Sequence, residues 1–135
     1  MIYLDSCAIV KLIVPEVESS ALIDWLNAHS VESIGTSMLT EVEVPRALRR
    51  ARPDRLALMA GTLVRFNRFE IDAPVRATAG AYTEPNLRSL DAIHLATAEN
   101  LLASGKRITA FVTYDKRLAS AAVEAGLTVV APGAA

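Results

Sequence analysis

The chain has 135 residues, of which 52% are hydrophobic, a length and composition that predict one domain, residues 1–135, with a buried core. Its net charge is −1, and no apolar run approaches the roughly 20 residues that span a bilayer, which argues against a membrane protein. The opening MIYLDSCAIVKL has an acid at position 5 and no basic leader, so we expect no signal peptide. The single cysteine, Cys7, excludes an internal disulfide and fits a cytoplasmic location, and we expect it to be a buried structural thiol.

The first half of the chain predicts short strands that alternate with longer helices. Pro15 ends the first helix, apolar residues from Val17 to Leu26 follow at helical spacing, and Pro53 suits the first turn of a later helix. The expected strands are residues 2–4 and 33–36, and the expected helices are residues 6–14, 16–28, 37 or 40 to 51, and 53–68.

The second half continues this alternation, with Gly105 and Gly126 at natural helix ends. The expected strands are residues 70–73, 110–113 and 127–130, the expected helices are residues 75–82, 90–103 and 115–124, and residues 83–88 form a loop. The alternation predicts an α/β fold in which helices cover both faces of a parallel sheet. In such sheets, ligands bind beyond the carboxyl ends of the strands.

Four acidic residues from separate segments are expected at that edge of the sheet. Asp5 ends the first strand, and Asp115 follows the strand at 110–113. Asp91 opens a helix, and Glu43 lies in the first turns of the helix that follows residues 33–36. Because helices in this architecture begin at the carboxyl edge, we expect all four acids to share one neighbourhood.

Each acid also has a purely structural interpretation. Asp5 or Asp115 could cap the helix that follows it, and Asp91 could complement a helix dipole. Thr40 and Glu43 have the spacing of a capping box. None of these interpretations requires all four acids to meet at one edge.

Crowded carboxylates repel one another, and a hard divalent cation such as Mg²⁺ or Mn²⁺ relieves the repulsion by taking oxygen ligands. The only histidines are His29 and His94, and no Cys/His cluster exists, which argues against zinc; we expect His94 to pack or hydrogen-bond. A metal-activated water beside a basic surface suits phosphodiester hydrolysis without a protein nucleophile. Arg46, Arg49 and Arg50 are the candidates for contact with an RNA backbone, although a solvated helix face is the simpler interpretation of that cluster.

The segments MIYLDSCAIVKL, EVPRAL, LDAIHLATA and FVTYDKRLASAA resemble, in order and spacing, the acidic motifs of PIN-domain ribonucleases. The closest resemblance is to the VapC toxins of bacterial type II toxin–antitoxin systems, and it runs from residue 1 to about residue 130. It implies a three-layer α/β/α sandwich with a central parallel sheet and a Mg²⁺- or Mn²⁺-dependent endonuclease that cleaves RNA. It also implies a homodimer and a cognate VapB-type antitoxin whose C-terminal segment reaches toward the acids.

Carried over by position, the resemblance assigns the catalytic and metal-binding roles to Asp5, Glu43, Asp91 and Asp115. It gives Ser6 and Thr113 supporting roles. The pattern E-V-x-R-A selects Glu43 over Glu41 for the second acidic position.

Two features of the helical region between the acids bear on these expectations. Pro45 departs from the family pattern, and inside a helix it removes a backbone hydrogen bond and could bend the segment that carries Glu43. Val64, Phe66 and Phe69 are candidates for an apolar surface that receives an antitoxin or a second protomer, and core packing is the alternative.

Two other classes of protein would place acids at this edge. The first is a non-enzymatic Mg²⁺-binding module comparable to a phospho-acceptor receiver domain, although receivers carry acids paired closely in sequence and this chain does not. The second is a nuclease-like fold retained only for protein binding, which the presence of all four acids argues against.

Overall fold

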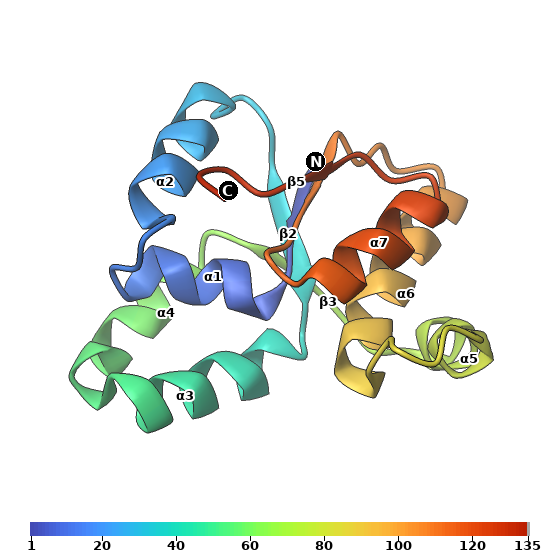
Figure 1. Ribbon diagram of the computed structural model, residues 1–135, viewed down its shortest axis with the longest axis horizontal. Coiled ribbons are helices and arrows are strands. Elements are labelled where there is room, and N and C mark those ends of the chain that lie inside the picture. Colours follow the sequence, from blue (N-terminus) through green and yellow to red (C-terminus); the bar gives the residue numbers. More distant parts are fainter. Residues whose placement is uncertain (135) are drawn as a thin grey trace.

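A computed structural model describes residues 1–134, so residue 135, the last of the expected domain, lies outside the described residues. The core of the fold is a five-stranded parallel sheet with the strand order β3-β2-β1-β4-β5 (Figure 1). The strands are β1 (Ile2–Leu4), β2 (Ile34–Ser37), β3 (Asn67–Phe69), β4 (Ala110–Val112) and β5 (Val129–Val130). The helices are α1 (Ser6–Ile13), α2 (Ser19–Ala28), α3 (Thr40–Ala51), the 3-10 helix η1 (Pro53–Leu58), α4 (Met59–Leu63), α5 (Ala73–Ala81), α6 (Ser89–Ala103) and α7 (Lys116–Glu124).

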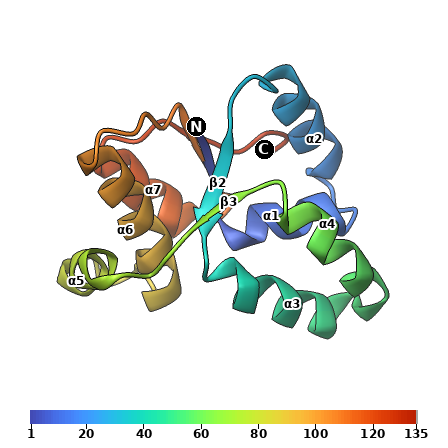
Figure 2. The ribbon, with the colours of Figure 1, turned by 180° about the vertical axis from the view of Figure 1, so that it is seen from behind.

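Helices cover both faces of the sheet, which confirms the predicted three-layer α/β/α sandwich. Helices α1 to α4 lie on one side and α5 to α7 on the other, as the front and back views show (Figures 1 and 2). Alternate side chains of β1 point to opposite faces, as the strand period of two requires. Ile2 and Leu4 therefore belong to the core under α1 to α4, whereas Tyr3 packs with Leu95 and Phe111 in the core under α6 and α7.

The region between α3 and α5 differs from the sequence expectation. The single helix expected at 53–68 is divided into η1 and α4, and the strand expected at 70–73 is instead Asn67–Phe69. Two local features explain the shift. Phe69 pairs in parallel with Ser37 of β2, and Asp72 accepts a hydrogen bond from the Val75 backbone N–H at 3.1 Å, so residues 70–72 are used to start α5.

Other expectations about single elements have mixed outcomes. Helix α2 begins at Ser19 instead of residue 16, and α3 continues through Pro45 from Thr40 to Ala51. The expectation that Cys7 is buried is wrong: its side chain is exposed, because it lies in the first turn of α1 on the face turned away from the core. Within residues 1–134, none of the helices combines the length and apolar character needed to cross a bilayer.

Candidate active site at the carboxyl edge of the sheet

The sheet order creates a switch point between β1 and β4. From β1 the chain adds β2 and β3 on one side, and β4 and β5 lie on the other. Ligand sites in open parallel sheets form at the carboxyl ends of strands at such a point. Leu4 pairs with Val112, so the residues that follow these two strands, Asp5 and Thr113, are neighbours.

Asp5 is held rigidly at this point. It is 3% exposed and caps α1, where its Oδ1 accepts the Ala8 backbone N–H at 2.9 Å. Its Oδ2 accepts the Thr113 hydroxyl at 2.6 Å. Burial raises the pKa of Asp5, and the charge of Asp91 raises it further, against the opposing influence of His94 and these hydrogen bonds.

Asp115 is connected to Asp5 through the same hydroxyl group. Its backbone N–H donates to Thr113 Oγ1 at 3.2 Å, and its Oδ1 caps α7 by accepting the backbone N–H groups of Arg117 and Leu118, each at 2.9 Å. The cap uses Oδ1 alone, which leaves Oδ2 directed toward Arg88 at 3.4 Å. Thr113, selected from sequence as a supporting residue, therefore bridges two of the four acids.

Asp91 lies in the first turn of α6 and is half-buried. Burial raises its pKa, the nearby charge of Asp115 raises it further, and Arg88, 3.5 Å away at Nε, acts in the opposite direction. Because Arg88 contacts Asp91 Oδ2 at 3.5 Å and Asp115 Oδ2 at 3.4 Å, these two carboxylates face the same space.

Glu43 reaches the site from α3. Its Oε1 accepts the Ser6 hydroxyl at 2.6 Å and lies 3.0 Å from His94 Nε2. Burial alone would raise the pKa of Glu43, but the hydrogen bonds from His94 and Ser6 outweigh it and the net shift is downward. The capping-box interpretation is wrong, since the Thr40 hydroxyl donates to the Ser37 carbonyl and α3 has no side-chain cap.

His94 and Tyr3 form a buried support for the site: the expectation that His94 packs or hydrogen-bonds is confirmed, whereas Tyr3 was not identified from sequence. The Tyr3 hydroxyl lies 2.8 Å from His94 Nδ1, and Nε2 faces both Glu43 and Ser6. Burial raises the pKa of Tyr3 well above its usual value, so its hydroxyl keeps its proton as it hydrogen-bonds to Nδ1. An ionised carboxylate can only accept, so Nε2 donates to Glu43. The position of His94 three residues after Asp91 was the available signal.

The competing acid and the predicted partner residues lie elsewhere. Glu41 points outward and pairs with Arg68 at 3.0 Å, so it does not enter the site. The expectation of an apolar partner surface is wrong for Phe66, which is buried in the core under α1 to α4; Phe69 packs partly against the other core, and Val64 is 71% exposed.

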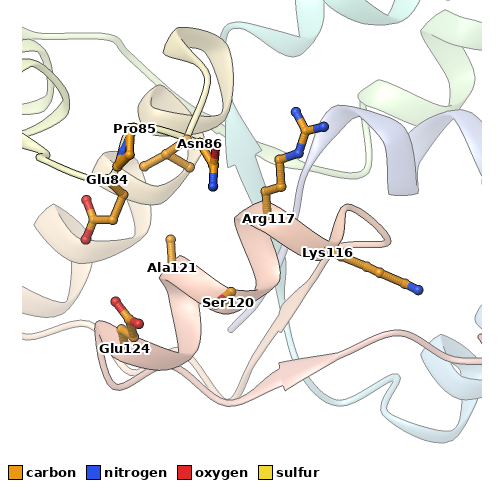
Figure 3. A pocket seen from close by; sticks show the side chains of 9 residues that line it. Glu84, Pro85, Asn86, Lys116, Arg117, Ser120, Ala121 and Glu124 are labelled. Carbon is orange, nitrogen blue, oxygen red and sulfur yellow. The ribbon is translucent and has the colours of Figure 1, made fainter.

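An arginine-lined groove and a pocket of mixed charge lie near the acids. Arg46, Arg49 and Arg50 are all exposed on α3, and Arg46 and Arg50 line a groove that also contains Glu43 and Leu90 of α6. On the other side of the acids, a pocket of about 420 Å³ lies between the loop before α6 and the helix α7 (Figure 3). Lys116 and Arg117, which directly follow Asp115, contribute to its lining.

Cys7, in the first turn of α1, lies within electrostatic range of all four acids. Although the residue is exposed overall, partial burial of its thiol and then the charges of Asp5, Glu43, Asp91 and Asp115 raise its pKa to about 11. Among residues 1–134, no three carboxylate, imidazole or thiolate groups are arranged as a ready-made metal-binding group. The chemistry of the donor set nevertheless fits a hard divalent cation, because the site supplies carboxylate oxygens whose mutual repulsion such an ion would relieve.

Comparisons with known proteins agree with this geometry. The PIN domain family matches residues 2–124. Ribonuclease VapC35 of Mycobacterium tuberculosis is 55% identical over 135 residues, covering 100% of this chain and 99% of that protein. Ribonuclease VapC47 of the same organism is 39% identical over 137 residues, covering 99% of this chain and 98% of that protein.

Solved structures show the same fold at low sequence identity. FitAcB from Neisseria gonorrhoeae superposes with a TM-score of 0.74 at 20% identity, covering 98% of each chain. VapC20 of M. tuberculosis, a sarcin–ricin loop cleaving toxin, gives 0.73 at 18% identity, covering 98% of this chain and 100% of that chain. A toxin–antitoxin complex from Klebsiella pneumoniae gives 0.69 at 20% identity, covering 98% of each chain. From the family match and the identity to the named relatives, the chain belongs to the PIN-domain family, within its VapC ribonucleases.

Proposed function

We infer that this chain is the endoribonuclease toxin of a toxin–antitoxin pair, that it acts in the cytoplasm, and that Asp5, Glu43, Asp91 and Asp115 hold Mg²⁺ or Mn²⁺ for hydrolysis of RNA phosphodiester bonds. The observation that carries the inference is the convergence of four acids from separate segments at the switch point of the sheet. The pKa of Asp91 is raised by its burial and then by Asp115, and the thiol of Cys7 responds to all four acids. The identity to proteins named ribonucleases supports the same assignment.

The four acids would bind the cation, and neighbouring side chains would position the acids. When bound, the ion would supply a water of lowered pKa and stabilise negative charge on the phosphate. Thr113 fixes Asp5 through a 2.6 Å hydrogen bond, and Ser6 and His94 fix Glu43. The Cys7 thiol is unsuited to act as a nucleophile, because its pKa is about 11.

Arginines on α3 suit contact with the RNA backbone. Arg46 and Arg50 share a groove with Glu43, so a strand of RNA lying in it would pass close to the acids. Arg49 is exposed on the same helix. Such contacts are electrostatic and independent of sequence, and they give affinity that falls with salt.

The partner would be an antitoxin. The neighbour from K. pneumoniae is a toxin–antitoxin complex, and it shares the fold of this chain over 98% of each chain. We propose a VapB-type antitoxin for this protein, and a homodimer as its own assembly.

The proposed activity is tested with purified protein and labelled RNA. Wild type should cleave the RNA when Mg²⁺ or Mn²⁺ is present and should stop when a chelator is added. Asp91→Asn, which keeps the shape of the side chain and removes its charge, should be inactive, whereas Asp24→Asn, on the exposed surface of α2, should be fully active. Cleavage by scrupulously purified Asp91→Asn protein at the wild-type rate would refute the assignment.

The receiver-like alternative disagrees with the sheet. Receiver domains have the strand order 2-1-3-4-5, whereas this sheet has the order β3-β2-β1-β4-β5. The switch point here lies between β1 and β4, where the Thr113 hydroxyl connects the Asp5 carboxylate to the backbone N–H of Asp115.

A further inference from the structure

Arg88 places its guanidinium between two of the four acids. It is the residue before α6, and its Nε lies 3.5 Å from Asp91 Oδ2 while its Nη2 lies 3.4 Å from Asp115 Oδ2. Asp91 lies in the first turn of α6 and Asp115 caps α7, so a single side chain bridges the starts of two separate helices.

The two oxygens that face Arg88, Asp91 Oδ2 and Asp115 Oδ2, are among the carboxylate oxygens of the site that accept no hydrogen bond from another residue. Asp115 uses Oδ1 to cap α7, and both oxygens of Asp5 accept hydrogen bonds from Ala8 and Thr113. Glu43 Oε1 is occupied by Ser6 and His94. The Arg88 guanidinium therefore lies beside the part of the acidic site where the carboxylate oxygens accept the fewest hydrogen bonds from other residues.

The ion pairs of Arg88 with Asp91 and Asp115 are weak. Both contacts are long for a charged hydrogen bond, and the Arg88 side chain is 68% exposed. Ion pairs that are open to water contribute little to stability, and they weaken further as salt is added. A divalent cation carries twice the charge of a guanidinium and would compete for the same oxygens.

We propose that Arg88 is a resident counter-ion that competes with the divalent cation for Asp91 and Asp115 and thereby sets the metal affinity of the site. This rests on the proposed function, since it needs a metal at these acids. In the metal-free protein Arg88 compensates the repulsion between the two carboxylates. Its side chain withdraws into solvent when the ion binds, which its exposure allows.

Calorimetric titration of Mn²⁺ tests this proposal with four proteins: wild type, Arg88→Gln, Arg88→Lys and Arg65→Gln. Arg65 is the matched control, because it is an exposed arginine at the opposite edge of the sheet, beside Ser33 and Ile34 at the start of β2. Arg88→Gln should bind Mn²⁺ about fivefold more tightly than wild type, because it removes a weak, solvent-exposed competitor for the two carboxylates. The Mn²⁺ affinity of Arg88→Lys should be close to that of wild type, and the affinity of Arg65→Gln should equal it. High salt should reduce the difference in Mn²⁺ affinity between Arg88→Gln and wild type.

Nuclear magnetic resonance gives a second measurement that does not depend on affinity. The Nε–H signal of Arg88 should move as Mg²⁺ is added, and the signal of Arg65 should stay where it is. An unmoved Arg88 signal at saturating Mg²⁺ would overturn the proposal.

The calorimetric outcomes separate this proposal from the proposed function. If wild type binds Mn²⁺ and Arg88→Gln binds it equally or more weakly, the proposal is wrong and the proposed function stands. If neither wild type nor Arg88→Gln binds Mn²⁺, both are wrong.

Discussion

His94 Nε2 lies 3.0 Å from Glu43 Oε1, which connects a buried imidazole on α6 to an acid on α3. His94 is 1% exposed, and its other ring nitrogen is held by Tyr3 of β1 at 2.8 Å. The orientation of Glu43 on α3 is thus fixed by His94 on α6, which is itself held by Tyr3 on β1. A carboxylate held in this way needs little reorganisation when it takes up a ligand.

Replacing His94 tests this support. His94→Leu removes the donor to Glu43 and leaves the Tyr3 hydroxyl buried without its partner, so the free energy of unfolding should fall by about 2 kcal/mol. The pKa of Glu43 should rise, because the largest influence that lowers it is lost. His94→Gln keeps an N–H donor near Glu43 and should leave that pKa lower than in His94→Leu. Carboxyl NMR titration and chemical denaturation measure both effects, and equal Glu43 pKa values in the two variants would contradict this role.

Thr113 is expected to contribute through its hydroxyl group alone. Thr113→Val keeps the shape of the side chain but removes the donor to Asp5 Oδ2, leaving a buried carboxylate oxygen unpaired. We expect a loss of about 1–3 kcal/mol in the free energy of unfolding and a further rise in the pKa of Asp5. Thr113→Ser keeps the hydroxyl and should retain most of the stability. A valine variant as stable as the serine variant would show that the hydrogen bond contributes nothing.

The ionised Asp91 side chain should lower the stability of the metal-free protein at neutral pH. Because its pKa is raised, the native state holds a proton at pH values where the unfolded chain has released it, so stability falls as pH rises through that window. Asp91→Asn should therefore raise the Tm at pH 7 in the presence of chelator, by about 2–4 °C. The gain should disappear below the usual carboxyl pKa of about 4, where wild-type Asp91 is protonated as well. Calorimetry across pH measures this, and a lower Tm for Asp91→Asn at pH 7 would be the opposite result.

Glu41 and Glu43 provide a matched pair on one helix. Glu43→Gln removes a charge that faces Ser6 and His94, whereas Glu41→Gln removes one that pairs with Arg68 outside the site. We expect RNA cleavage to be lost in the first variant and unchanged in the second. Cleavage rates at saturating Mn²⁺ decide between them, and a loss in both variants would mean that overall charge, not position, matters.

The arginines of α3 should differ in their effect on RNA binding. Arg50 lines the groove that contains Glu43, and Arg49 is exposed outside the set of residues that line it. Both Arg49→Ala and Arg50→Ala should weaken binding more at low salt than at high salt, with the larger effect for Arg50. Fluorescence anisotropy with Arg65→Ala as control measures this. Equal losses for Arg50 and Arg65 would indicate a general charge effect.

The sequence was sufficient to predict the parts of the fold that depend on simple rules. Alternating strands and helices predict a parallel sheet, and the rule that sites form at the carboxyl edge places Asp5 and Asp115 there without any coordinates. The position of β3 could not be predicted, because Asn67 and Arg68 have no strand pattern and become a strand only by pairing with β2.

Side-chain contacts between distant segments were also beyond prediction. The Tyr3–His94 hydrogen bond joins residues 91 positions apart, and the Ser6–Glu43 bond joins residues 37 positions apart. Cys7 was predicted to be buried from its apolar neighbours, but the first turn of α1 turns it outward. In each case tertiary packing decides an outcome that local pattern leaves open.

The most direct test of the account is the location of Mn²⁺ in crystals of wild-type protein, from its anomalous scattering. We expect one strong peak at the carboxyl edge of the sheet, coordinated by Asp91 and Asp115 and by at least one of Asp5 and Glu43, and no such peak in Asp91→Asn. Saturated crystals with no peak between these acids, or with Mn²⁺ bound only elsewhere on the chain, would contradict it.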